Sequence, residues 1–525
     1  MSQRIDSRLS QLINAGQQHL LRNGLKGLEK ESLRLAPDGV IAHTPHPIGV
    51  GSALTHPYIT TDYSEALIEL ITPPHADPAE TLRFLEDLHT FVYRNLGEEI
   101  LLATSMPCGV AGDESIPIAE YGTSNIGRMK HVYRRGLAYR YGRTMQAIAG
   151  VHFNYSVNEA LWPVLRELKG GSESLSGFIA DNYFGMVRNV HRYGWLTIYL
   201  FGASPAFCKS FFTGREHLIS EFSEFDAQTL FRPYATSLRM SDIGYKNDSQ
   251  AGLEISFDNL EDYVASLGKA IETPFPLYER IGVKVDGEYR QLNGNILQIE
   301  NEYYSIIRPK QITESGEKPT LALKKRGVRY LELRSLDLEC FSPAGANLDQ
   351  LRFLEIFLLF CLLEESSPLD SAEKAEVSRN GMAVACCGRT PGFKLRRKGG
   401  EISLKGWAAE MLDAMRGIAE ILDAGDALKP YTRSLEAQGD LLSDPERTPS
   451  ARMLAEMKEN GESFAAYALR LSNEHARVFR ERSLSAERAA LFRRYSEQSL
   501  EEQRRIEAGD RFSFDEFLQR YFAQA

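Results

Sequence analysis

Four short segments, widely separated in the sequence, alternate apolar and polar residues with the period of a β-strand. They are GLEKESLRL (27–35), ALIELIT (66–72), GVHFNYS (150–156) and RYLELRSL (329–336). Successive side chains of a strand point to opposite faces, so each segment predicts a strand with one apolar face and one charged or polar face. A sheet built from such strands has a wall of carboxylates, which must be solvated, paired or bound to cations.

The rest of the sequence is dominated by helical spacing. Apolar residues recur every three to four positions in 5–22, 79–96, 181–202, 348–365 and 404–425. Strand patterns nearly vanish after about residue 347, and strict strand–helix–strand alternation, typical of parallel sheets, is missing. The chain is therefore predicted to be α+β, with a mainly antiparallel sheet in a catalytic region, 1–346, and a helical C-terminal region, 347–525, packed on it.

The composition is that of a globular protein. Of 525 residues, 43% are hydrophobic and 25% are charged. The formal net charge is −10, and no basic stripe with interleaved aromatic residues occurs, so nucleic acid is not an expected partner. A polyanion such as ATP would need local arginine, lysine or metal ions. No P-loop, dinucleotide-binding or protein-kinase motif offers another nucleotide site.

Targeting signals and cysteine pairs are also missing from the sequence. The N-terminal segment has no continuous apolar stretch, and no apolar run approaches the ~20 residues that span a membrane. None of the six cysteines forms a Cys-x-x-Cys pair, which predicts free or buried thiols; a regulatory disulfide stays open as an alternative. We expect a cytoplasmic protein that does not associate with membranes.

The acidic residues of the first two segments lie where an isolated carboxylate is costly. Glu29 and Glu31 are two positions apart and share one strand face, where their charges repel unless a proton or cation lies between them. Glu69 interrupts an otherwise apolar strand, and Asp62 lies a few residues upstream of it. Bound metal ions would satisfy all four carboxylates.

The other two segments add an imidazole and a guanidinium. His152 shares a strand face with Asn154, and Glu332 shares one with Arg334. Each segment alone fits an ordinary half-exposed sheet face equally well, and His152 alone fits a hydrogen-bonded structural histidine. Five carboxylates, one imidazole and one guanidinium together favour divalent cations beside phosphates, for which Mg²⁺ is the usual ion.

These segments and their surroundings resemble the bacterial glutamate–cysteine ligases, also called γ-glutamylcysteine synthetases. The similarity runs from residue 27 to about 345 and includes GLEKESLR (27–34), GSALTHPYITTDYSEALIELITP (51–73), SMPC (105–108), YGTSNIGRMK (121–130), AGVHFN (149–154), YLFGASPA (199–206), PYATSLRMSDIGY (233–245), NGNILQIENEYY (293–304), IRPK (307–310) and YLELRSLD (330–337). The helical C-terminal third matches only in general character. The resemblance implies a fold like that of glutamine synthetase, in which a curved antiparallel sheet holds ATP, metal ions and amino acids on its concave side.

The resemblance also implies roles for individual residues. The positions that look like Mg²⁺ ligands are Glu29, Glu31, Asp62, Glu69, His152 and Glu332. Arg334 looks like the arginine that contacts the transferred phosphoryl group, so Arg334 and Glu332 are the predicted catalytic pair. The cysteine pocket is expected at Tyr133, Tyr245 and Tyr304, with Tyr303 as the alternative to its neighbour. Arg239 and Gln146 are expected to contact substrate or nucleotide, and a structural role fits each of them as well.

The implied reaction is the first step of glutathione synthesis. The γ-phosphoryl group of ATP is transferred to the γ-carboxylate of L-glutamate, and the amine of L-cysteine then displaces phosphate. The expected enzyme is a monomer that uses Mg²⁺ or Mn²⁺ and excludes water with a loop around 242–250. One rival is a related ligase that uses ammonia or another amine; three tyrosines argue against ammonia, which needs no side-chain pocket. The other rival is a regulatory protein without turnover, against which the seven chemically competent positions argue.

Overall fold

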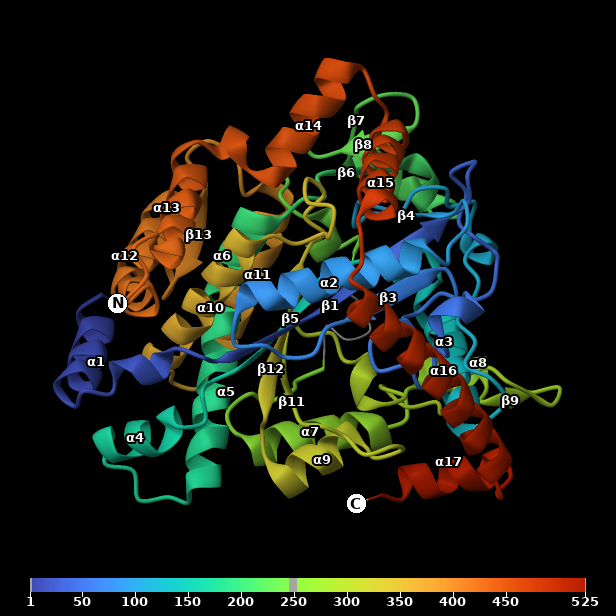
Figure 1. Cartoon of the computed structure of the whole chain (residues 1–525), viewed down its shortest axis with the longest axis horizontal. Helices are drawn as coiled ribbons and strands as arrows, with labels where there is room; N and C mark the ends of the chain where they lie inside the picture. Colours follow the sequence, from blue (N-terminus) through green and yellow to red (C-terminus); the bar gives the residue numbers. More distant parts are fainter. Residues whose placement is uncertain (1, 245–252, 525) are drawn as a thin grey trace.

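The computed structural model describes residues 2–244 and 253–524 and is organised around one seven-stranded sheet (Figure 1). Its strands are β1 (Leu25–Leu35), β2 (Ile59–Thr61), β3 (Leu67–Ile71), β4 (Ile100–Leu101), β5 (Val151–Ser156), β11 (Ile307–Lys310) and β12 (Tyr330–Leu336). The order is β11-β12-β5-β1-β3-β2, with β4 paired to the end of β1, and every pairing is antiparallel. The four predicted strands are β1, β3, β5 and β12, and the α+β architecture with an antiparallel sheet is confirmed.

One face of the sheet forms the centre of the hydrophobic core. Leu28 of β1 pairs with Phe153 of β5, Phe153 with Leu333 of β12, and Leu333 with Ile307 of β11. None of these four side chains is exposed. Because this face must be apolar, alternation along each strand turns the charged residues to the other face, which is called the polar face below.

Helices cover the apolar face of the sheet. The strands contact α2 (Pro78–Tyr93), α5 (Leu175–Tyr193) and α6 (Trp195–Phe201), and α10 (Leu348–Leu363) packs against α2 and α5. In Figure 1, α2 crosses the sheet beside β1 and β3. Two buried polar contacts also join this face to the helices. Lys26 of β1 forms an ion pair with Glu355 of α10, and Lys30 of β1 contacts His89 of α2.

The predicted helices are present, with two differences. The helix expected over 5–22 is α1 (Ser2–Asn14) followed by a short 3-10 helix, η1 (Gln18–Leu21). Gly16 lies between them with a φ of +68°, a left-handed conformation that ends helices. The helix expected over 181–202 is two helices, because α5 and α6 are separated at Gly194. Both differences fall at glycines, which weaken helix continuity.

Shorter elements surround the sheet and carry further site residues. The helices are α3 (Asn125–Tyr141), η4 (Thr144–Ala147), α4 (Leu161–Leu168), η7 (Leu238–Met240), α7 (Leu260–Glu272), α8 (Pro276–Ile281), η9 (Glu300–Glu302) and α9 (Pro319–Arg326). The strands are β6 (Ala206–Cys208), β7 (Ser223–Glu224), β8 (Thr229–Phe231), β9 (Lys284–Val285) and β10 (Glu288–Tyr289).

The chain after residue 346 is mainly helical, as predicted. Besides α10 it contains α11 (Ser371–Cys387), α12 (Leu404–Leu422), α13 (Pro430–Ser443), α14 (Pro449–Asn460), α15 (Phe464–Glu481), α16 (Ala486–Gly509), α17 (Phe514–Phe522) and a hairpin, β13 (Lys394–Arg397) and β14 (Gly400–Ser403). The main buried cluster extends from Ile5 to Phe492, so this region shares one core with the sheet. A division at residue 346 stays a prediction.

Two further expectations concern membranes and thiols. Among the described residues, no helix has both the length and the apolar character that a bilayer crossing requires. All six cysteines are free thiols, and five of them are buried, Cys387 being the exposed one. The prediction of free or buried thiols is confirmed.

Candidate active site

The register of three strands brings acidic and imidazole groups to the polar face. Glu29 of β1 pairs directly with His152 of β5, and Glu31 of β1 pairs directly with Glu69 of β3. Residues opposite each other in an antiparallel pair project from the same face of the sheet. The four side chains therefore project together, as the alternation of the sequence predicts.

His152 is the centre of this group. Its Nδ1 lies 3.1 Å from Glu29 Oε2 and 3.5 Å from Glu332 Oε1, and its Nε2 lies 3.6 Å from Glu31 Oε1. Asn154 donates from Nδ2 to Glu29 Oε1 at 2.8 Å. Glu29, His152 and Glu332 each offer a ligand atom within 4.8 Å of the others, a spacing that suits one metal ion.

An irregularity in β12 places Arg334 beside this group. Leu333 pairs with Phe153, but the next pair is Leu336 with Val151, so two residues of β12, Arg334 and Ser335, face one residue of β5. Such bulges twist a strand and redirect side chains, and they are common next to active sites. Arg334 donates to Glu332 Oε1 at 3.0 Å while about a fifth of its side chain stays exposed.

The crowded carboxylates alter one another's affinity for protons. Burial, followed by the charges of Glu29, Asp62, Glu31 and Glu332, raises the pKa of Glu69 well above its usual value. Burial, followed by the charge of Asp62, raises the pKa of Glu31. A bound divalent cation would relieve this repulsion and favour the ionised carboxylates.

Cations from β11 lie on the other side of Glu332. Lys310 Nζ is 3.3 Å from Glu332 Oε2, and Arg308 is the direct cross-strand partner of Glu332. Burial acts to raise the pKa of Glu332, but the charges of Lys310, Arg334 and His152 outweigh it and hold that pKa well below its usual value. Glu332 is therefore a carboxylate held between cations, whereas Glu31 and Glu69 face other carboxylates.

Lys310 and Arg308 are candidates that the strand patterns left unmarked. The sequence Ile307-Arg308-Pro309-Lys310 does alternate, with both cations on one face. A run of four residues is too short to identify a strand by period alone, and its pairing with β12 is not visible in the sequence.

Two of the predicted tyrosines lie close to each other, and one of them contacts Gln146. Tyr133 is on α3, and Tyr304 follows η9 and donates from its hydroxyl to Gln146 Oε1 at 3.5 Å. Gln146 is buried, and its Nε2 has no hydrogen-bond partner in the part of the chain that the structure describes. Burial raises the pKa of Tyr304 to about 12 and, with Glu302 and Tyr304 nearby, raises that of Tyr133 as well.

The remaining predicted residues lie at the border of the polar face or outside the described chain. Arg239 is buried and donates from Nη2 to the carbonyl oxygen of Arg334 at 3.0 Å. Asp62 directly follows β2 and is half-buried. Its negative charge contributes to the raised pKa values of Glu31 and Glu69. It is not part of the close Glu29–His152–Glu332 group. Tyr245 and residues 245–250 of the predicted loop are outside the described residues.

Comparisons with known proteins identify the family. Residues 9–384 match the family model described as glutamate-cysteine ligase. A glutamate–cysteine ligase of Pseudomonas entomophila is 51% identical over 504 residues, 96% of this chain and 94% of its own, and one of Pseudomonas putida is 50% identical over 523 residues, 100% and 99%. The chain belongs to the glutamate–cysteine ligase family.

Two solved structures agree with the fold. A glutamate–cysteine ligase of Francisella tularensis, solved in complex with AMP, superposes with a TM-score of 0.90 at 38% identity, covering 95% of this chain and 98% of that one. A bifunctional glutathione synthetase of Pasteurella multocida superposes with a TM-score of 0.72 at 27% identity, covering 93% of this chain but 58% of that longer one. The motifs that carried the resemblance all lie within the range matched by the glutamate–cysteine ligase family model.

Proposed function

We propose that this protein is an ATP-dependent ligase that joins the γ-carboxyl of L-glutamate to the amine of L-cysteine, giving γ-glutamylcysteine, ADP and phosphate. The observation that carries the proposal is the meeting, on one sheet face, of the carboxylates around His152 with the cations Arg334 and Lys310. Membership of the glutamate–cysteine ligase family supports the substrates.

The cluster of carboxylates around His152 is suited to binding divalent metal ions. We assign them to Glu29, Glu31, Asp62, Glu69, His152 and Glu332, and the spacing of Glu29, His152 and Glu332 together with the raised pKa values of Glu31 and Glu69 supports this assignment. Oxygen ligands suit Mg²⁺, and the imidazole also suits Mn²⁺. When bound, such ions would offset the charge of the triphosphate and of the approaching glutamate carboxylate.

The chain's own cations complete the charge balance. Arg334 offers a planar fork of donors to phosphoryl oxygens, and Glu332 orients it through the 3.0 Å hydrogen bond. Lys310, on the opposite side of Glu332, adds a second positive charge. Phosphoryl transfer depends mainly on positioning and charge neutralisation, which this arrangement supplies.

A carboxylate does not react with an amine until it carries a leaving group. A γ-carboxylate oxygen of glutamate attacks the γ-phosphorus of ATP, and ADP leaves. The cysteine amine then attacks the γ-carbonyl carbon of the resulting acyl phosphate, and phosphate leaves with the original carboxylate oxygen. Gln146 and Arg239 are proposed to contact substrate or nucleotide. For Gln146 this is supported by a buried donor without a partner among the described residues.

The acyl phosphate route makes an isotopic prediction. Glutamate labelled with ¹⁸O in its γ-carboxyl should transfer one label to inorganic phosphate at each turnover, which mass spectrometry of the phosphate measures. ADP should be the nucleotide product. Release of AMP, or phosphate free of label, would contradict this route and indicate adenylation instead.

The tyrosines are proposed to form the cysteine pocket. Tyr133 and Tyr304 are close to each other, and Tyr245, outside the described residues, is assigned to the pocket by resemblance alone. A phenol suits this role because its ring packs on sulfur while its hydroxyl contacts the thiol. Ammonia needs no such pocket, so an assay panel of cysteine, 2-aminobutyrate and ammonia separates this function from that of an ammonia-using ligase.

Replacing Tyr304 or Tyr133 with phenylalanine should raise the KM for cysteine by about threefold to tenfold, the value of one hydrogen bond. The KM for 2-aminobutyrate, which has a methyl group in place of the thiol, should change less, and those for ATP and glutamate should stay nearly constant. Steady-state kinetics within each variant measure the difference. An equal rise in the KM values for cysteine and 2-aminobutyrate would mean that these tyrosines have a structural role and do not recognise the thiol.

Further properties accompany this proposal. We infer that the enzyme is a monomer located in the cytoplasm and that it catalyses the first step of glutathione biosynthesis. The division of the chain into 1–346 and 347–525 is proposed on the change from mixed to mainly helical structure.

A further inference from the structure

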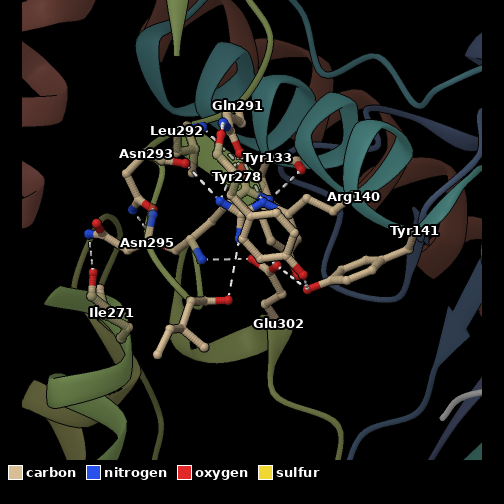
Figure 2. A network of polar contacts seen from close by, with 12 residues as sticks. Tyr133, Arg140, Tyr141, Ile271, Tyr278, Gln291, Leu292, Asn293, Asn295 and Glu302 are labelled. Carbon is tan, nitrogen blue, oxygen red and sulfur yellow. Dashed lines mark hydrogen bonds and ion pairs between the residues drawn. The ribbon is translucent and has the colours of Figure 1, made fainter. Parts of the chain in front are cut away.

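Arg140 belongs to a polar network that also includes Tyr133, one of the tyrosines of the proposed cysteine pocket (Figure 2). It is on α3, about two helical turns after Tyr133 and on the same side of the helix. Its side chain is not exposed at all, yet all five of its N–H groups donate hydrogen bonds. The acceptors are Gln291 Oε1, which receives two at 2.9 and 2.8 Å, Glu302 Oε1 at 2.8 Å, and the carbonyl oxygens of Asn293 at 2.7 Å and Ile296 at 3.5 Å.

Glu302 is the anionic partner of Arg140 and is equally buried. Its Oε1 also accepts from the Tyr141 hydroxyl at 2.6 Å, and its Oε2 accepts from the backbone N–H of Gln298 at 2.7 Å. Tyr304 is two residues further along the chain. The ion pair thus joins the helix that carries Tyr133 to the segment that carries Tyr304.

Gln298 adds a second connection between the same two elements. Its side chain donates to the carbonyl oxygen of Tyr133 at 3.2 Å and accepts from the backbone of Leu292 at 3.0 Å. Gly136 makes the approach possible, because a Cβ there would lie 2.1 Å from Gln298 Oε1. The segment is therefore attached to α3 both at Tyr133 itself and at Arg140.

We propose that Arg140 and Glu302 are positioning residues that set the separation between Tyr133 and Tyr304 and thereby the preference for cysteine over amines of similar size without a thiol. The proposal rests on the cysteine-ligase function proposed above. Within the described part of the chain, Arg140 and Glu302 act on the substrate through the tyrosines, since both side chains are buried and hydrogen-bonded to protein groups.

An ion pair suits a positioning role better than an apolar contact would. A buried pair adds little net stability, because desolvation offsets the attraction, but it can specify one geometry. The guanidinium is planar and rigid, and stacking on the ring of Tyr278 at 4.1 Å fixes its plane. A thiol is a weak hydrogen-bond donor, so its recognition depends on close placement of both phenols.

Glu302→Gln tests the proposal with minimal change in shape. Either orientation of the new amide turns its NH2 towards an existing donor, Arg140 or the backbone N–H of Gln298. We expect the ratio of kcat/KM for cysteine to kcat/KM for 2-aminobutyrate to fall about threefold to tenfold. The fall should come from the KM for cysteine, while the KM for ATP stays within about twofold.

The control is Glu355→Gln. Glu355 is also a buried carboxylate that accepts from a buried cation, Lys26, and a tyrosine hydroxyl, that of Tyr431, but it lies on the apolar side of the sheet. Its replacement should leave the selectivity ratio unchanged even if the Tm falls. Arg140→Lys, which keeps the charge but not the fork of donors, should lower the ratio partway.

Gly136→Ala provides a test that keeps the ion pair intact, since it displaces the Gln298 side chain by steric contact alone. It should also lower the selectivity ratio. If the Tm falls in Glu302→Gln, Arg140→Lys and Gly136→Ala while the ratio equals that of wild type, the network is only structural and the proposal is overturned. A wild-type protein that forms no γ-glutamylcysteine would instead refute the proposed function, and a ratio unchanged in Tyr133→Phe and Tyr304→Phe would refute the pocket.

Discussion

Glu332→Gln should lower turnover by roughly 10³-fold or more while the fold persists. Losing a single preorganised charge-stabilising group commonly costs about 10²–10³ in rate. Glu332 contributes more than one interaction, because it contacts Lys310, Arg334 and His152 at 3.3, 3.0 and 3.5 Å. A neutral amide would turn an NH2 group towards either Lys310 or Arg334. The measurement is kcat for γ-glutamylcysteine formation, with circular dichroism as the test of folding.

Two comparisons make the Glu332 result specific. Glu29→Gln, which removes another ligand of the proposed metal site, should lose activity similarly and weaken Mn²⁺ binding measured by electron paramagnetic resonance. Glu339→Gln alters a carboxylate that accepts from the backbone of Phe341 and from Asn347, away from the polar face, and should stay active. Near-wild-type turnover of both Glu332→Gln and Glu29→Gln at moderate Mg²⁺ would exclude the metal assignment.

Arg334→Ala should lower kcat by about 10²–10³ and change the KM for ATP little. The bulge in β12 places the guanidinium beside Glu332. We propose that the guanidinium there contacts the transferred phosphoryl group rather than the nucleoside. Arg334→Lys should recover only part of the rate, because lysine lacks the planar fork. Arg329→Ala, at the start of the same strand and paired with Glu159 in solvent, is the matched control and should retain full activity.

The alternative outcome for Arg334 is informative. A variant with normal kcat and a raised KM for ATP would mean that this arginine binds the ground state and the transition state equally well. Its proposed role would then be binding of ATP and not stabilisation of transferred charge.

Much of the polar face could be predicted because it depends on a local rule. Alternation within each strand places Glu29 with Glu31 and Glu332 with Arg334, whatever the neighbouring strands are. The pairing of strands then adds what the sequence cannot show, such as Glu29 opposite His152, 123 residues away. The bulge, in which Arg334 and Ser335 of β12 lie opposite a single residue of β5, is likewise a property of the β12–β5 pairing and not of either strand alone.

Other features depend on contacts between distant elements. Arg140 and Glu302 are 162 residues apart, and neither belongs to a pattern that would mark it, since a lone charged residue on a helix normally predicts a solvent-exposed face. The helix breaks at Gly16 and Gly194 were missed because an isolated glycine is often tolerated within a helix. The three tyrosines were assigned by resemblance alone, and the proximity of Tyr133 to Tyr304 became visible only in the fold.

The strand order has a consequence for how the protein is made. β1 is among the first elements synthesised and its partner β5 follows more than a hundred residues later, while β11 and β12, which bring the cations, come later still. Such high contact order slows folding, because distant segments must meet before their contacts compensate for the lost chain entropy. A nascent chain that has reached β5 carries Glu29, Glu31, Glu69 and His152 but none of the cations of β11 and β12. Any partial sheet that forms at this stage would lack those cations beside its carboxylates. We therefore expect repulsion between these carboxylates to disfavour formation of the sheet until β11 and β12 have been added.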